Sequence, residues 1–323
     1  MKRSYLSLVS ALGVAGIMGG AVQAATVAHW TFENAVDADT GNVIAASDGL
    51  VLEGTNAPGP DGTAYMPDIS GNDNRLYQFP QGGVFSSDVQ YAMTPQTGVA
   101  NNFSYKTNGA DLFEQGDGNI RTAMNGAGQF TFEVSFKTSA TNAWQGIIGH
   151  DRNPDDSGDQ NKGNGDNDES LGTLWIGING VNSKLHFYHW DTTPGGDLLN
   201  VTDPGQTGQP EIGVGPAIEA DKWYSLAMVG DGSSVKLYLK SETDSTYQLI
   251  HTHGGLGLAD SSATWTIGRG WFNGPNDFFQ GNLDDVRISD EALAVDDLLG
   301  SPIPEPASAA LMMFGISMIA KRR

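Results

Sequence analysis

The stretch that most constrains this chain lies near its C-terminal end, between residues 265 and 290, and reads WTIGRGWFNGPNDFFQGNLDDVRISD. Polar and apolar residues alternate on both sides of a turn rich in Gly, Asn and Pro, which is typical of two half-buried strands. The second strand, Phe278 to Ser289, loses its alternation at Gly281 and at Asp284–Asp285, so we expect a bulge there. Such a strand cannot bury its apolar face alone, and the chain must supply a partner.

The segment Thr26 to Glu33, TVAHWTFE, alternates in the same way and has no local hairpin partner. We predict that it pairs antiparallel with Phe278–Ser289, although about 250 residues separate them. Phe130 to Thr138, FTFEVSFKT, is the clearest strand, with three Phe and Val134 on one face. The sequence also predicts hairpins at 173–179 with 184–190 and at 222–229 with 234–240, and strands at 145–150 and 247–253. Residues 81–127 look irregular, with two weak strands, and Ser289 or Asp290 is placed to cap a helix over 291–299.

The composition fits a sandwich of strands. The chain has 323 residues, of which 43 are Gly and 17% are charged, and turn residues recur between the alternating segments. Cysteine is absent, which excludes disulfides, thiolate metal sites and a Cys nucleophile. The net charge of −21 argues against nucleic acid as a partner, because phosphates would be repelled.

Both ends of the chain carry targeting patterns. Residues 1–24 have a basic start, an apolar middle and small residues before Ala25, as a secretory signal peptide does. The C-terminus reads Pro304-Glu305-Pro306, then a mostly apolar run of 14 residues, then Lys321-Arg322-Arg323. That order closely resembles the PEP-CTERM sorting signal, which implies an exosortase-like membrane protease as a partner. It also implies transient anchoring in the membrane and release to the surface or medium of a Gram-negative-type bacterium. A plain membrane anchor is the alternative, although 14 residues are short for a bilayer-spanning helix.

Four motifs in order resemble the laminin-G-like, concanavalin A-like jelly rolls: AHWTFE at 28–33, DISGN at 68–72, KWYSLAMV at 222–229 and GNLDDVRI at 281–288. The resemblance implies an all-β fold, an antiparallel β-sandwich, over residues 25–300. Residues 1–24 would then be a signal helix and residues 301–323 an apolar sorting helix. The sequence departs from the family pattern by a long insert at 34–67, in which DADTGN at 37–42 is an alternative candidate for the turn motif.

The resemblance also implies a structural calcium ion. In that family a calcium can tie the turn, here Asp68, Gly71 and Asn72, to the closing strand, here Asp284. The alternative is that Asp68 and Asn72 only cap their own turn. A second calcium alternative is the acidic loop 151–170, which lacks EF-hand spacing. The spaced pairs His186/His189 and His251/His253 have the residue type for metal binding but no evident third ligand.

Glycan sites combine aromatic platforms with amides, which singles out Trp271, Phe272 and Asn273 in the turn, and Trp190 at a strand end. These rings could instead be wedges against the end of the sandwich. No catalytic residue is assigned: Glu133 is alone on its strand, and Asp284 and Asp285 are adjacent, so their side chains should point to opposite faces. We therefore predict an exported surface or matrix protein that binds carbohydrate or protein without catalysis. The alternative is a glycan-cleaving enzyme on the same scaffold.

Overall fold

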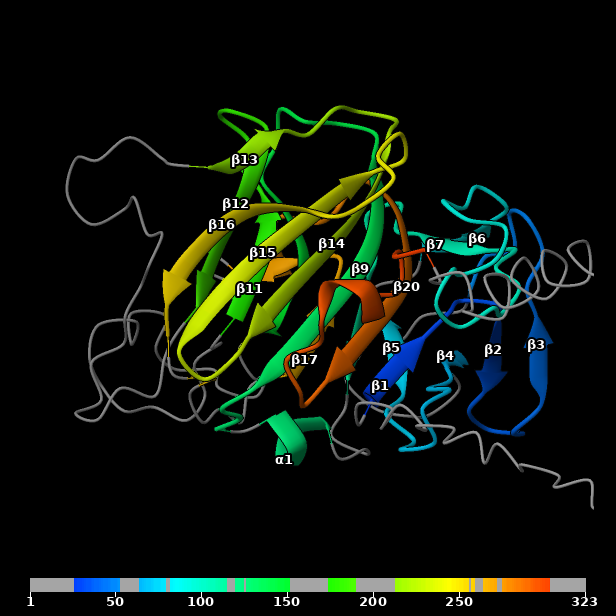
Figure 1. Cartoon of the computed structure of the whole chain (residues 1–323). Helices are drawn as coiled ribbons and strands as arrows, with labels where there is room; N and C mark the ends of the chain where they lie inside the picture. The colour runs from blue at the N-terminus through cyan, green and yellow to red at the C-terminus, as the bar shows by residue number, and fades with distance from the viewer. Residues whose placement is uncertain are drawn as a thin grey trace, which may run out of the picture.

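The protein is a β-sandwich of two antiparallel sheets that face each other (Figure 1). The computed structural model describes residues 26–52, 64–79, 82–114, 120–124, 126–151, 174–189, 213–255, 257–258, 264–271 and 275–302. The predicted terminal helices lie outside these ranges. Within them, no helix is long and apolar enough to span a membrane.

The eight-stranded sheet contains the predicted closure of the fold. Its order is β16 (Gln248–Gly254), β15 (Ser234–Ser241), β14 (Trp223–Gly230), β9 (Phe130–Thr138), β20 (Gly281–Ser289), β7 (Ser104–Lys106) and β6 (Val84–Ser86). β1 (Thr26–Trp30) pairs antiparallel with the second half of β20, with His29 opposite Arg287 and Trp30 opposite Val286. The prediction that these distant segments are neighbours is therefore confirmed.

The ten-stranded sheet forms the other layer. Its order is β13 (Val214–Ala217), β12 (Lys184–His189), β11 (Leu174–Ile178), β10 (Gln145–Asp151), β17 (Thr264–Ile267), β8 (Asp111–Glu114), β5 (Leu76–Phe79), β4 (Ala64–Met66), β2 (Asn34–Asp37) and β3 (Val43–Ala45). A small hairpin, β18 (Gly270–Trp271) with β19 (Pro275–Asn276), stands beside it. Both predicted hairpins are present as β11–β12 and β14–β15. Residues 81–127 are more regular than predicted, since they supply β6, β7, β8 and the short helix α1 (Ile120–Met124).

The core lies between the sheets and is built by alternation. Phe130, Phe132, Val134 and Phe136 of β9 point inward, where Phe132 packs 5.0 Å from the ring of Trp265 on β17. Burying one such ring contributes about 1.5–3 kcal/mol, so this row alone holds the layers together strongly.

The outer face of β9 is unexpectedly buried as well. Thr131, Glu133 and Ser135 are at most 5% exposed because two segments cross this face: residues 87–103, the cover loop, and residues 290–302, the C-terminal strap. The strap bonds directly to the sheet, since the N–H of Leu293 donates to Thr131 and the N–H of Leu299 donates to Glu133.

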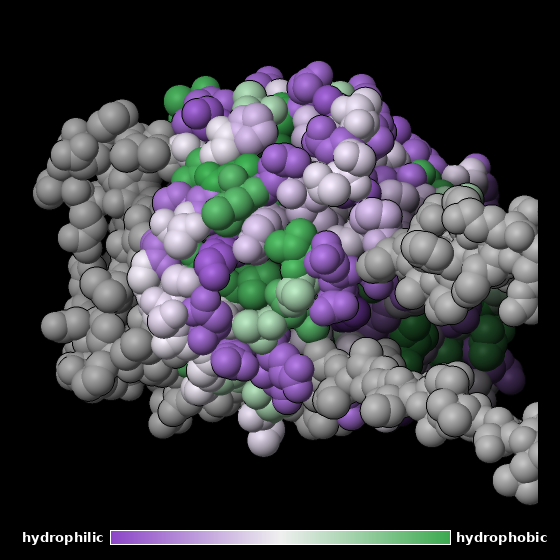
Figure 2. Space-filling model, viewed as in Figure 1, coloured by the Kyte–Doolittle hydropathy of each residue, from purple (hydrophilic) through white to green (hydrophobic). Residues whose placement is uncertain are grey.

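The predicted helix over 291–299 is wrong, and the strap gives the reason. Its only helical part is a 3-10 turn, η1 (Val295–Asp297), with no side-chain cap. Ser289 is still part of β20, and Leu293 and Leu299 donate their N–H groups to side chains of the sheet rather than to carbonyls within a helix. Figure 2 shows that this face of the molecule mixes hydrophilic residues with small hydrophobic groups. Beneath the strap lies a separate buried cluster, in which Leu298 packs with Ala227 and Val229 of β14 and with Tyr247.

Candidate functional site

One row of paired residues crosses six strands on the outer face of the ten-stranded sheet. From β11 to β4 it reads Trp175, Gly149, Thr266, Phe113, Tyr77 and Tyr65. The rings of Tyr65 and Tyr77 are 5.7 Å apart and those of Tyr77 and Phe113 are 6.3 Å apart. Five spacings between strands make the row about 24 Å long. Tyr77 and Phe113 are buried, and Tyr65 at the β4 end of the row is half-buried.

The β11 end of the row is a cluster of three rings. His186 of β12 lies between Trp144 and Trp175, with ring centroids 5.2 Å and 5.5 Å away and both contacts edge-on. Trp175 is buried, whereas Trp144 and His186 are half-buried. This end of the row is therefore partly open to solvent.

Glycines make room for the Trp175 indole. A Cβ added to Gly177 would lie 2.5 Å from Cη2 of the indole, and one added to Gly270 would lie 2.8 Å from its Nε1. Gly149, next to Trp175 across the sheet, would bring a Cβ within 3.1 Å of Cδ1. Real Cβ atoms are almost never closer than 3.0 Å, so the indole is seated where the strands have no side chains.

The β18–β19 hairpin adjoins this cluster and carries part of the predicted glycan site. Gly270 of β18 contacts the Trp175 indole, and a Cβ on Gly146 of β10 would meet the backbone of Arg269 and Gly270. The backbone of Trp271 pairs with Pro275, so the structure brings that stretch to the same end of the sheet. The Trp271 side chain and residues Phe272, Asn273 and Trp190 lie outside the described residues, and their roles remain predictions.

Charged groups flank the rings. Arg269 and Asp111 form a buried ion pair with a distance of 3.0 Å. Asp277 is half-buried, and burial raises the pKa of its carboxyl. Its carbonyl accepts the N–H of Gly146, which fixes it close to Gly270 and the edge of Trp175. This face therefore offers aromatic surface, an imidazole and a carboxyl in one place.

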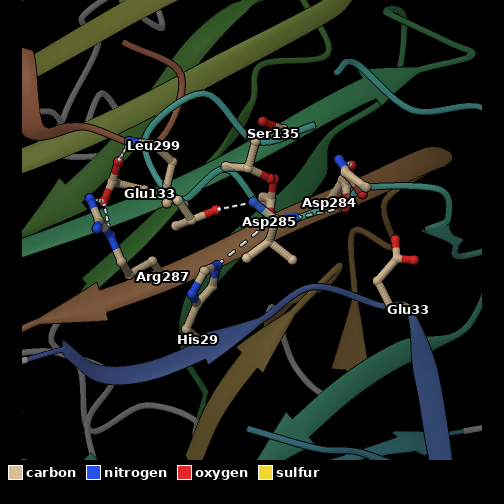
Figure 3. Close-up of polar contacts among 12 residues, drawn as sticks. His29, Glu33, Glu133, Ser135, Asp284, Asp285, Arg287 and Leu299 are labelled. Carbon is tan, nitrogen blue, oxygen red and sulfur yellow. Dashed lines mark hydrogen bonds and ion pairs between the residues drawn. The ribbon is translucent and has the colours of Figure 1, made fainter. Parts of the chain in front are cut away.

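The outer face of the eight-stranded sheet is different, because it holds a buried group of charges (Figure 3). We call it the polar node: His29, Glu133, Asp284, Asp285 and Arg287. The Glu133 carboxylate accepts a hydrogen bond from Arg287 Nε at 2.5 Å and another from the N–H of Leu299 at 2.6 Å. Burial raises the pKa of Glu133, although Arg287 opposes that effect. His29 Nε2 lies 3.6 Å from Asp285 Oδ1.

The predicted bulge in β20 is confirmed, and it corrects one expectation. The pairing of β20 with β9 shifts between Asp284 and Arg287, and Asp285 has a left-handed backbone with φ of 44°. Asp284 and Asp285 do not point to opposite faces as predicted: both are buried and both accept from the cover loop, Asp284 from Asn101 and Asp285 from Thr94. Burial and the neighbouring Asp285 raise the pKa of Asp284 well above its usual value.

The predicted calcium residues of the turn bind β1 directly. Asp68 accepts from the N–H of His29 at 2.9 Å and also from Ser70 and Asn74. Asn72 Nδ2 donates to the carbonyls of Thr26 and Val27, and Gly71 has a positive φ of 92°. The turn is thus hydrogen-bonded to the free edge of β1, whereas Asp284 accepts from Asn101 of the cover loop. Within the described ranges, no three His, Cys, Asp or Glu side chains converge to hold a metal. A calcium ion joining the turn to Asp284 remains a prediction.

The histidines singled out as possible metal ligands pack against rings where their side chains are described. His251 and His253 of β16 lie 5.3 Å from Phe187, and burial lowers the pKa of His251. Sequence reasoning missed Trp144, Trp175 and His186 as one cluster, because they come together only through strand register. It also missed Arg287 as the partner of Glu133, although the DDVRI motif contains it.

A laminin-G-type family profile, described as the concanavalin A-like lectin/glucanases superfamily, matches residues 114–298, more than half of the chain. No curated protein matches the sequence. The described fold and the profile agree on the central strands, including β9, β14 and β20.

Solved structures with a similar arrangement include domain 4 of AbnA, an extracellular GH43 arabinanase from Geobacillus stearothermophilus, in complex with arabinotriose. It is 14% identical, with 85% of this chain and 97% of that chain covered and a TM-score of 0.47. A structure of botulinum neurotoxin type C, whose cell entry depends on two ganglioside molecules, is 15% identical over 77% of this chain, with a TM-score of 0.41. This chain covers 49% of that one, about half its length. The CBM40 of a Ruminococcus gnavus sialidase, bound to α2,3-sialyllactose, is 17% identical over 58% of this chain and 89% of that chain, with a TM-score of 0.38. These TM-scores lie below 0.5, so the family match and not these likenesses carries the assignment.

Proposed function

The chain belongs to the concanavalin A-like lectin/glucanases superfamily, and from this premise we propose that it is a carbohydrate-binding protein. Its glycan site is the outer face of the ten-stranded sheet, centred on Trp144, His186 and Trp175. The observation that supports this most is the partly open cluster of rings at the β11 end of the row, where Trp144 and His186 are half-buried. The eight-stranded sheet offers no comparable surface, because the cover loop and the C-terminal strap occupy its outer face.

Sugar rings stack on aromatic faces through their C–H groups, and nearby polar groups orient them by hydrogen bonds. Trp144 and His186 would supply the accessible ring surface, and Asp277 would supply an acceptor. Trp271, on the adjacent hairpin, would extend the platform. In this proposal the turn around Trp271 borders the site.

The test is binding to a panel of extracellular polysaccharides, followed by calorimetry on the best ligand. Trp144→Ala and Trp271→Ala should each weaken binding about tenfold or more, which corresponds to about 1.4 kcal/mol. Tyr238→Ala is the matched control, since Tyr238 is a half-buried aromatic residue on β15 of the other sheet. Equal losses in all three variants, or full affinity in Trp144→Ala, would contradict the proposed site.

A second candidate is the glycan-cleaving enzyme, and one observation favours it. Asp277 lies beside the ring cluster with a raised pKa, as a general acid would. Glycosidases need a second carboxyl at a defined distance, and the carboxyl of Asp111 on β8 is buried and held by Arg269. Reducing-sugar release from the best-binding polysaccharide, abolished in Asp277→Asn, would establish this function. Binding without release would leave the protein a lectin.

We also propose that the protein is exported and processed at its C-terminus. The support is the sequence pattern at residues 1–24 and 304–323. Protein from the native host should begin at or near Ala25 and lack Lys321–Arg323, as read by intact mass. An unprocessed C-terminus in the surface fraction would instead indicate a permanent membrane anchor.

A further inference from the structure

The cover loop ends in an apolar tip, residues 92–100, which a β-bridge between Met93 and Ala100 closes. Met93 is 57% exposed and Val99, on the other arm of the turn, is 42% exposed. Residues 89–103 contain no Asp, Glu, Lys or Arg, although these residue types make up 17% of the chain. Single exposed apolar residues need no explanation, but two that share one uncharged turn indicate a contact surface.

The base of this tip is fixed to the sheet by polar contacts. The side chains of Thr94 and Asn101 donate to carboxylates of β20, and both residues are at most 2% exposed. The exposed side chains of Met93 and Val99 are therefore not what holds the tip in place. Their apolar surface is available for a partner outside the folded body.

The chain leaves the folded body at the same tip. Gln96, midway along the tip between its two exposed side chains, donates its backbone N–H to the carbonyl of Leu299 at 3.3 Å. Its side-chain Nε2 donates to the carbonyls of Ser301 at 3.0 Å and Pro302 at 3.5 Å. From these residues the chain continues into the C-terminal sorting segment. The start of that segment is thus held beside the exposed apolar side chains.

The connection from the strap to the apolar run is short. Only four residues, 303–306, separate Pro302 from the start of the run at Ala307, so the connection reaches at most about 18 Å. As a helix the 14 residues of the run would measure about 21 Å, which is about 9 Å less than the hydrocarbon core of a bilayer. The basic tail Lys321–Arg323 can extend to one surface, so the shortfall draws the other end of the run below the headgroups. An anchored chain would therefore hold its folded body close to the lipid.

We propose that the tip of the cover loop is a membrane-contact surface, which touches the lipid interface while the C-terminal segment anchors the chain. The inference rests on the proposed export and anchoring. Met93 and Val99 would enter the interface, where apolar side chains are favoured and no charge of the tip has to lose its water. Asp296, whose carbonyl accepts from Gln96, and Asp297 are exposed beside the tip. The surface therefore fits a zwitterionic lipid, and an anionic lipid would repel it.

The contact depends on the tether because the tip is small. Two apolar side chains do not hold a protein on a membrane by themselves. A short tether makes the contact intramolecular, with an effective concentration on the order of millimolar, so a weak contact is still formed. Cleavage within residues 303–306 would remove the tether. The tip would then leave the lipid, and the processed body would be released.

A single environment-sensitive label tests the contact, because the chain has no cysteine of its own. Val99→Cys and Val181→Cys are a matched pair, since Val181 is 72% exposed in the turn between β11 and β12 of the other sheet. The full chain is labelled and reconstituted in phosphatidylcholine vesicles that carry a nitroxide quencher just below the headgroups. The label of Val99→Cys should be quenched about twofold or more over that of Val181→Cys. Phosphatidylglycerol vesicles should reduce this difference. Equal quenching at both positions would overturn the proposal.

A second substitution adds a charge to the tip. Met93→Glu in labelled Val99→Cys should remove most of the quenching and leave melting nearly unchanged, because Met93 is exposed. Val43→Glu, at an exposed position on β3, should leave the quenching as it was.

Flotation of the vesicles separates this proposal from the anchoring on which it rests. A chain that floats with the vesicles while the Val99→Cys label stays in water keeps its anchor and overturns the tip contact. A chain that does not float has no anchor, and both proposals fail. A spectral shift of the label without quenching by the lipid would mean that a second copy of the chain covers the tip, which would also overturn the proposal.

Discussion

The outer faces of the two sheets of this sandwich differ in the side chains they carry and in what covers them. On the eight-stranded sheet, β9 and β20 carry acids and a base outward, and the cover loop and the C-terminal strap bury them. On the ten-stranded sheet, β11, β8, β5 and β4 carry aromatic rings outward, and glycines of β10, β11 and β18 leave room for the Trp175 indole. One face is closed over paired charges, and the other carries a row of rings that is half-buried only at its ends.

The difference teaches where function can lie in this molecule. Buried charges must be matched by partners, so the polar node is committed to holding loops in place. On the ten-stranded sheet Trp175, Phe113 and Tyr77 are buried, and the half-buried rings lie at the two ends of the aromatic row: Tyr65 at one end, and Trp144 and His186 at the other. Those ends are where a ligand can contact ring surface. The carboxylates that first draw attention in the sequence, Asp284 and Asp285, are thus part of the closure of the fold and not of the glycan surface.

The largest effect should come from breaking the charge pair of the polar node. Arg287→Ala leaves Glu133 buried without its cation and should lower the free energy of unfolding by about 3–5 kcal/mol. Arg75→Ala is the control, because Arg75 pairs with Asp73 on the surface and should lose less than about 1 kcal/mol. Denaturant unfolding of both variants measures the contrast, and equal losses would mean that the node does not act as a buried pair.

A smaller loss is expected at the DISGN turn, which is hydrogen-bonded to β1. Asp68→Ala removes the acceptor of His29, Ser70 and Asn74 and should lower the free energy of unfolding by about 1–3 kcal/mol. Asp37 belongs to the alternative copy of the motif, but its carboxylate accepts from the N–H groups of Asp39 and Thr40 in its own turn and not from β1. Asp37→Ala should therefore leave unfolding nearly unchanged. A large loss there would show that both copies support the strand.

Much of this architecture could be predicted from the sequence because it depends on local alternation. The inward face of β9, the two hairpins and the pairing of β1 with β20 all follow from residues repeating every two positions. The bulge was also predictable, since the alternation of β20 breaks at Asp284–Asp285.

The outward faces could not be predicted, because they depend on what lies above them. Glu133 reads as an exposed strand residue, and only the strap, bonded through Leu299, buries it. The strap itself reads as a helix because its residues fit one, yet its N–H groups find better partners in the sheet. Trp144, Trp175 and His186 become one cluster only through the register of β11 and β12.

The glycines that make room for the Trp175 indole offer a test of the aromatic face. Gly177→Ala would push a methyl group into the indole and into the carbonyl of Gln145, which should lower the free energy of unfolding by about 1–3 kcal/mol. Because the displaced ring belongs to the proposed glycan site, affinity should fall as well. Gly254→Ala on β16 meets no atom within 4 Å and should change neither quantity. Unchanged affinity in Gly177→Ala, with Trp175 displaced in its structure, would separate the ring from the site.

The smallest expected effect is the pH dependence of Asp277. Burial raises the pKa of its carboxyl, so the folded state disfavours the charged form. At neutral pH that penalty is fully present, because both the folded and the unfolded states are ionised. It fades as the pH falls through the folded pKa toward the unfolded value of 3.8. Asp277→Asn should therefore be more stable than the parent at pH 7, and this advantage should shrink as the pH falls toward 3.8 and disappear at lower pH. The difference should stay below about 1 kcal/mol, because the half-exposed carboxyl is partly solvated.

Melting of parent and variant across this pH range measures the difference, with Asp290→Asn, at an exposed position, as the control. An advantage that persists unchanged at pH 4 would mean that the amide gains a contact and that charge is not the cause. A bound neutral glycan should enlarge the advantage at pH 7, since a ligand that covers Asp277 removes more of its water. No change with ligand would place Asp277 outside the glycan site while leaving the ring cluster in it, and would remove the one observation that favours an enzyme.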